Sequence, residues 1–272
     1  MLSKFPKSSK FLLLLLAILA FGIFLSNLNQ NPSLDNYFLG AQNLFFPKQA
    51  NDNRINESIE NQVKNLDGHW GIAIKDLKTA NSYYYHETDE FKSASLYKLA
   101  VMWAAFDAIK KGQIAKEEIQ PQIQSMITYS DNDSAVYLAE KLGWDNISYL
   151  MDQEGLADIN LTDPPQVTAN SILNLLERIY RNTAVSPAYS QDMKNLLFTQ
   201  QINDRIPKYL PQNTKVGHKT GELDFLRHDA GIVIGKNSHY IFVFLTETPV
   251  PEEASDQIAR LSKKIFDELE KD

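Results

Sequence analysis

A serine and a lysine, Ser95 and Lys98, stand three residues apart in the segment SASLYKLAVMWAAF, which begins at Ser93. A serine hydroxyl is a weak nucleophile and needs an adjacent base. At positions i and i+3 of a helix the two side chains share one face. A buried Lys98 with a lowered pKa could then accept the serine proton. Ser95 is equally suited to cap a helix N-terminus, and the local sequence leaves both interpretations open.

Two further short segments carry polar groups suited to the same chemistry. Ser130-Asp131-Asn132 comes just before a predicted helix, and Lys219-Thr220-Gly221 ends a predicted strand. Alone, the first reads as cap and turn chemistry and the second as an ordinary strand end. In a chain of this composition, the expected number of chance matches is about one or two for SxxK, about a tenth for SDN and a few hundredths for KTG. The three motifs in this order are therefore not expected by accident.

SxxK, SDN and KTG in this order resemble the signature motifs of penicillin-recognising serine enzymes, and class A β-lactamases are the nearest pattern. The resemblance extends over residues 54–272. It implies that Ser95 attacks the substrate carbonyl, with Lys98 as base. Ser130 would relay a proton to the leaving nitrogen. The backbone N–H groups of Ser95 and Glu222 would bind the oxyanion.

The same resemblance assigns the binding residues. Asn132 would hold the substrate amide and contact Lys98. Lys219 and Thr220 would bind a substrate carboxylate, and Gly221 would let the backbone come close to an extended ligand. The implied partner is a small molecule or peptide that carries a carboxylate.

The sequence leaves open whether the site contains further positive charge. Arg227 or His228 could add positive charge for a carboxylate, although a surface role for Arg227 fits equally well. His218 and His228 are expected to be packed rather than catalytic. The five histidines form no HExxH-like pair and the chain has no cysteine, so a zinc hydrolase is not expected, and we expect no metal in the catalytic site and no cofactor. The net charge of −7 argues against a nucleic-acid partner.

The chain departs from class A β-lactamases in one respect. Those enzymes position their deacylation water with a glutamate in an E-x-x-L-N segment, which is absent here. The loop expected between the SDN motif and LTDPPQVTAN is strongly shortened. Glu154 is the nearest acidic candidate, but its segment MDQEGLADI is typical of a helix end that stops at Gly155. The resemblance therefore implies acylation of Ser95 followed by slow deacylation.

The N-terminal region predicts a membrane anchor. Lysines 4, 7 and 10 precede fifteen uninterrupted apolar residues, 11–25. We interpret residues 1–28 as an uncleaved single-pass anchor, with a cleaved signal peptide as the alternative. Residues 29–53 form an Asn/Gln-rich tether, and residues 54–272 form the hydrolase domain. The domain would face the outside of the cell membrane, or be secreted if the segment is cleaved.

The hydrophobic periodicity predicts the elements that position these motifs. It indicates, in order along the chain, a helix from about residue 54, strands near 69–77 and 82–88, a run of helices, three strands from about 214 to 247 and a last helix from 252. This order predicts an α+β fold. Five antiparallel strands are flanked by the N- and C-terminal helices, and a trimmed helical lobe is inserted between the second and third strands.

Three functions remain open from the sequence. The first is a membrane-tethered serine hydrolase of the β-lactamase type, acting on β-lactams or related amides through an acyl-serine. The second is a D-alanyl-D-alanine carboxypeptidase or transpeptidase. The third is a penicillin-binding sensor module that does not turn over. We expect a monomer in each case.

Overall fold

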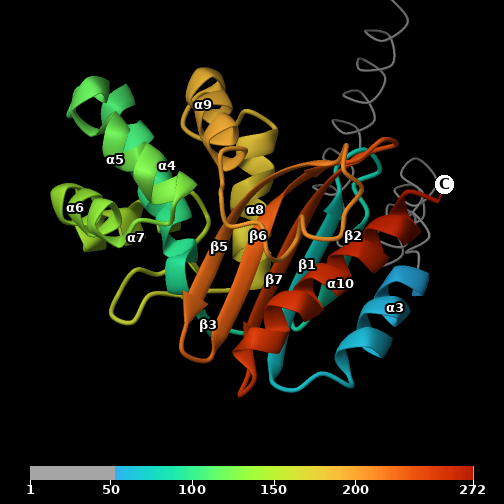
Figure 1. Ribbon diagram of the computed structural model, residues 1–272. Coiled ribbons are helices and arrows are strands. Elements are labelled where there is room, and N and C mark those ends of the chain that lie inside the picture. Colours follow the sequence, from blue (N-terminus) through green and yellow to red (C-terminus); the bar gives the residue numbers. More distant parts are fainter. Residues whose placement is uncertain (1–52, 272) are drawn as a thin grey trace, which may run out of the picture. The chain divides into compact units, whose positions relative to one another are not determined.

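The computed structural model describes residues 53–271. Its central sheet is antiparallel, with strand order β2-β1-β7-β6-β5, and it confirms the predicted α+β fold (Figure 1). The strands are β1 (His69–Asp76), β2 (Ser82–Tyr85), β5 (Lys215–Leu223), β6 (Leu226–Ile234) and β7 (His239–Glu247). β5 lies at one edge of the sheet, so one side of the KTG strand has no strand partner.

The two terminal helices, α3 (Asn53–Val63) and α10 (Pro251–Leu269), lie side by side on one face of the sheet (Figure 1). Ile55, Ile59 and Val63 are all buried there, as their four-residue spacing predicts. Side chains on the strands alternate between the two faces. Ile72 therefore packs with the terminal helices, whereas the neighbouring Ala73 packs with the helical lobe on the other face.

The helical lobe is inserted between β2 and β5, as predicted, and contains a large buried core. Its first long helix begins at Tyr97, because a short 3-10 turn, Ala94–Leu96, precedes it. The helices are α4 (Tyr97–Lys110), α5 (Lys116–Thr128), α6 (Asn132–Leu142), α7 (Trp144–Gln153), α8 (Ala169–Tyr180) and α9 (Pro187–Leu197).

Two features of this region are not anticipated by the sequence. α9 buries only Ser190, Met193 and Leu197, so its apolar periodicity is too weak to indicate a helix. β3 (Phe91–Lys92) and β4 (Gln166–Val167) form a separate two-stranded sheet, and strands of two residues have no detectable period. This small sheet matters for the site, because β3 leads directly into the turn that carries Ser95.

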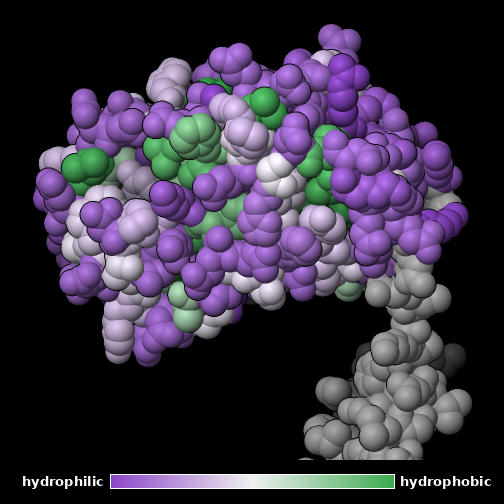
Figure 2. All heavy atoms as spheres, turned by 90° about the horizontal axis from the view of Figure 1, so that it is seen from below, coloured by the Kyte–Doolittle hydropathy of each residue, from purple (hydrophilic) through white to green (hydrophobic). Residues whose placement is uncertain are grey.

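The surface of the described part is mostly hydrophilic on the face seen in Figure 2, where hydrophobic side chains form small separate patches. None of the helices within residues 53–271 is long and apolar enough to cross a membrane. The predicted anchor, residues 1–28, and the tether up to residue 52 lie outside the described residues.

Candidate active site

Ser95 lies in the 3-10 turn that precedes α4 and is partly exposed. Ala94 has a φ of +44°, in the left-handed region, which bends the chain sharply between β3 and this turn. Neither the turn nor α4 is capped by a side chain. Within residues 53–271, the Oγ atom of Ser95 has no hydrogen-bond partner. The structure therefore does not support the capping interpretation, and the hydroxyl is free to react.

Lys98, one helical turn later, is completely buried. Its Nζ donates hydrogen bonds to the backbone oxygen of Ser130 at 2.6 Å and to Oδ1 of Asn132 at 2.7 Å. Burial lowers the pKa of the Lys98 amine to about 8, and the nearby Asp131 carboxylate offsets part of this shift. A much larger neutral fraction is therefore present near pH 7 than for an exposed lysine.

The SDN motif forms the turn between α5 and α6, and its three residues have different tasks. Asp131 caps α6, because its carboxylate accepts a hydrogen bond from the Ser134 N–H at 2.8 Å. Ser130 has a φ of +58°, which is uncommon for a residue with a side chain. The turn directs the Ser130 carbonyl and the Asn132 amide toward Lys98. Cap chemistry therefore accounts for only Asp131.

Lys219, on the KTG strand, lies next to the hydroxyl of Ser130. Its fully buried Nζ donates hydrogen bonds to Ser130 Oγ and to the Thr220 backbone oxygen, both at 2.8 Å. Burial, followed by repulsion from the Lys98 cation, holds the pKa of Lys219 well below its usual value, while Asp229 partly opposes the shift. Ser130 Oγ is also 3.3 Å from Lys98 Nζ. One hydroxyl thus lies between two lysine amines.

The backbone of β5 presents a donor along the free edge of the sheet. In an antiparallel edge strand, the backbone N–H and C=O groups of one residue point toward the neighbouring strand, and those of the next residue point away from it. The Thr220 carbonyl points away from β6, since it accepts a hydrogen bond from Lys219 Nζ. Glu222 lies two residues further along the same strand, opposite Arg227, so its backbone groups point to the same side as those of Thr220. Its N–H therefore also points away from the sheet, as an oxyanion donor requires.

Gly221 allows β5 to lie close to the serine turn. A Cβ atom at this position would lie 3.1 Å from His228 Cβ and 3.3 Å from Ala94 Cβ. These distances are tighter than most side-chain contacts, so a larger residue would push the strand away from Ser95. The glycine of the KTG motif thus serves the packing of the strand on the serine turn.

Arg205 is a site residue that the sequence does not reveal. Its guanidinium is buried and donates to Oε2 of Glu222 at 2.7 Å. Arg227 contacts the other carboxylate oxygen at 3.3 Å and also donates to the Leu223 backbone oxygen. Glu222 is thus held by two arginines. Arg227 is engaged with this carboxylate and with the β5–β6 hairpin. The segment RIPKYLP offers no local sign of a buried cation.

The two central histidines are packed, as expected. His228 accepts a hydrogen bond from the Thr246 N–H at Nδ1, and its Nε2 lies 2.9 Å from the Lys92 carbonyl oxygen. Burial lowers the pKa of His228 to about 4, so it is neutral and does not supply the extra positive charge considered from sequence. His218 is buried, and its Nδ1 is 2.8 Å from the Asp229 carboxylate.

Glu154, the acidic residue considered for water activation, follows the last residue of α7. Its carboxylate accepts a hydrogen bond from Arg178 of α8 at 3.1 Å. Gly155 follows with a φ of +69°, as expected for a helix stop. Among the described residues, Glu154 makes no hydrogen bond or ion pair with Ser95 or Lys98, and its arrangement is that of a surface ion pair.

The fold and this set of side chains define a serine hydrolase of the penicillin-recognising class. The sequence pattern of the family described as the "Beta-lactamase enzyme family" matches residues 53–120 and 117–269, and the chain belongs to that family. The predicted resemblance is thereby confirmed.

Individual relatives agree with this assignment. A protein named "Beta-lactamase" from Bacteroides uniformis is 25% identical, over 80% of this chain and 90% of its own length. A solved class A β-lactamase from Bacteroides cellulosilyticus has a TM-score of 0.74 at 20% identity, covering 83% of this chain and 100% of that one. The structure of PBP-A has a TM-score of 0.76 at 18% identity, covering 80% and 96%. These structural likenesses show a shared fold.

Proposed function

We propose that the chain reacts with β-lactams, or with related amides that carry a carboxylate, through an acyl-Ser95 intermediate. The observation that carries this proposal is the hydroxyl of Ser130, which lies 3.3 Å from Lys98 Nζ and 2.8 Å from Lys219 Nζ. This arrangement provides a path for the proton from the serine turn to a leaving nitrogen. A related protein, a variant of PBP-A, has been solved as an acyl-enzyme complex with penicillin G, at a TM-score of 0.76.

Acylation follows from these positions. The neutral Lys98 amine takes the proton of Ser95 Oγ while that oxygen bonds to the carbonyl carbon. The N–H groups of Ser95 and Glu222 stabilise the negative charge on the carbonyl oxygen. As the carbon–nitrogen bond breaks, Ser130 gives its proton to the nitrogen and regains one from Lys98. The product is an ester on Ser95 and a free amine.

Substrate orientation depends on the β5 edge and on the SDN turn. Lys219 keeps its amine at the centre of the site, where a substrate carboxylate would meet it together with the Thr220 hydroxyl. Asn132 bonds to Lys98 through Oδ1, which leaves its amide nitrogen for a substrate carbonyl. A carboxylate in the substrate would also favour the protonated form of Lys219.

Hydrolysis of the ester is proposed to be slow. Within residues 53–271, no carboxylate is hydrogen-bonded to Ser95, Lys98, Ser130 or Lys219. The nearby acidic groups are engaged elsewhere: Asp131 with the α6 N-terminus and Glu222 with Arg205. Among the described residues, no carboxylate is therefore held against the reacting groups by a hydrogen bond to serve as a base for water.

The same observation favours a second candidate, a D-alanyl-D-alanine carboxypeptidase or transpeptidase that β-lactams acylate as inhibitors. A long-lived ester also suits a penicillin-binding sensor module. Mass spectrometry of the purified chain with penicillin, followed over time, tests the proposal. One added penicillin mass that disappears supports a hydrolase, and a lasting adduct supports the carboxypeptidase or sensor. If no adduct forms at Ser95, the proposal is wrong.

We also propose that the domain is monomeric, tethered to the cell membrane and extracytoplasmic. The support lies in the sequence: lysines 4, 7 and 10 precede the apolar run 11–25, which predicts an N-in orientation. Membrane fractionation with protease-accessibility mapping tests the location. A soluble form that begins after about residue 26 would instead indicate a cleaved signal peptide.

A further inference from the structure

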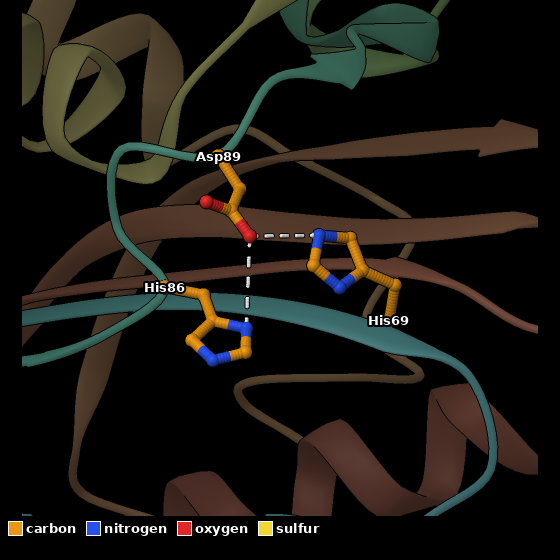
Figure 3. Close-up of side chains that lie close together, drawn as sticks. All are labelled: His69, His86 and Asp89. Atoms are coloured by element: carbon orange, nitrogen blue, oxygen red, sulfur yellow. Dashed lines mark ion pairs between the residues drawn. The ribbon is translucent and has the colours of Figure 1, made fainter.

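Three potential metal ligands meet away from the serine site. His69 is the first residue of β1, His86 follows β2, and Asp89 lies in the connection from β2 to β3. Figure 3 shows the three side chains pointing toward one another. Their ligand atoms all lie within 4.8 Å of one another, and it is the one such group among the described residues. We propose that these residues bind a divalent transition-metal ion such as Zn²⁺.

The two distances from Asp89 to the histidines fit a shared ion. Asp89 Oδ2 is 3.0 Å from His69 Nε2 and 3.6 Å from His86 Nδ1. Two ligands that bond a zinc ion at about 2.0–2.2 Å with tetrahedral geometry stand about 3.3 Å apart, between these two values. Two imidazoles and one carboxylate form a borderline donor set that suits zinc and its neighbours rather than calcium or magnesium.

The ligands are held in place before an ion arrives. The ring of His69 stacks on Phe91, with centroids 4.8 Å apart and an interplanar angle of 11°. The ring of His86 stacks on Tyr85 at 4.2 Å and 14°. Among the described residues, the side chains of His69, His86 and Asp89 make no hydrogen bond to another group. Their ligand atoms are therefore available, apart from their contacts with each other.

The three proposed ligands are open to solvent, so water can complete the coordination of a bound ion. The side chains of His69, His86 and Asp89 are 46%, 51% and 44% exposed. Three protein ligands leave at least one coordination position for water. The ion would clamp the start of β1 to the connection that continues through β3 to the turn of Ser95. The inference does not depend on the proposed reaction.

Zinc titration of the chelator-treated full-length chain by calorimetry tests the inference. We expect one saturable equivalent in the wild type. Losing only an outer partner of a metal site costs about 10–100-fold in affinity, so His86→Gln, His69→Gln and Asp89→Asn should each weaken binding by at least tenfold. Glu90→Gln removes the same charge from the same connection, and His239→Gln removes a histidine elsewhere. Both controls should bind like the wild type.

Thermal unfolding with and without zinc provides a second readout. An ion that binds only the folded chain raises the melting temperature in the wild type and in Glu90→Gln, but much less in Asp89→Asn. If His69 and His86 only form ion pairs with Asp89, the variants shift the melting temperature equally with and without zinc. That result, or saturable binding unchanged in all three ligand variants, would overturn the inference.

Discussion

Lys98 and Lys219 approach the same hydroxyl, that of Ser130, from two separate elements of the fold. Lys98 stands on α4 and Lys219 on β5, so the helical lobe and the sheet each place one amine at this side chain. Both amines are buried, and repulsion between two cations disfavours the state in which both are charged. The arrangement thus favours a state in which at most one of the two amines is charged, and burial leaves part of the Lys98 amine neutral before any substrate binds.

The pH dependence of acylation should report this neutral amine. With a pKa of about 8, Lys98 is neutral in roughly a tenth of molecules at pH 7. The active form is the deprotonated one. The acylation rate constant should therefore rise about tenfold per pH unit below 8 and level off above it. Stopped-flow acylation by a penicillin between pH 5.5 and 9.5 measures the profile, with circular dichroism to confirm folding. A flat profile would remove Lys98 as the base.

Replacement of the serine separates reaction from folding. Ser95→Ala should abolish covalent labelling by a fluorescent penicillin, because the attacking oxygen is removed. Since Ser95 caps no helix here, the free energy of unfolding should fall by less than about 0.5 kcal/mol, below the usual range for a lost cap. Labelling gels and denaturant unfolding measure the two effects. Ser95→Gly serves as a second non-reactive variant, and labelling that persists in either one contradicts the assignment.

The motif residues could be predicted because each motif is contiguous and the chemistry restricts its residue types. Helix and strand periods then predicted which elements carry Ser95, Ser130 and Lys219. What the sequence could not show is the contact between distant segments. Arg205 binds Glu222 only because the segment after α9 returns to the end of β5. Nothing near Arg205 in the sequence indicates that its guanidinium is buried.

The ambiguity at Ser95 and at the SDN turn was of a different kind. Ser and Asp residues before a helix usually cap it, so the residue type alone does not reveal a functional group at these positions. Only the structure separates Asp131, which caps α6, from Ser130 and Asn132, which face Lys98. The unpredicted β3–β4 pairing likewise depends on a contact between residues far apart in the chain.

Glu222 offers a test of the backbone donor that spares the side-chain chemistry. Proline is tolerated at edge-strand positions whose N–H points away from the neighbouring strand. Glu222→Pro removes that N–H, and loss of one oxyanion donor costs about 10²–10³-fold in rate. Glu222→Ala keeps the N–H and removes the same carboxylate, so it should acylate at least tenfold faster than the proline variant. Equal rates in the two variants would exclude this N–H as a donor.

The reaction time course should show a burst. Attack and expulsion of the nitrogen need only the groups assembled around Ser130, whereas hydrolysis of the ester needs an activated water. Within residues 53–271, no carboxylate is bonded to the reacting groups, and Glu154 is paired with Arg178. Loss of a positioned general base commonly costs about 10²–10⁴-fold, so the steady state should be slower than the burst by a factor of this order.

Pre-steady-state kinetics with a chromogenic cephalosporin measures both phases. We expect a burst of one equivalent of product per Ser95, followed by slow turnover. Lys98 is the group that would most directly contradict this expectation, because an amine with a pKa of about 8 can also activate water after acylation. Rapid linear turnover without a burst would mean that Lys98 or another group does so. Glu154→Gln then decides between them: it leaves such turnover intact if Lys98 is the base and slows it if Glu154 is.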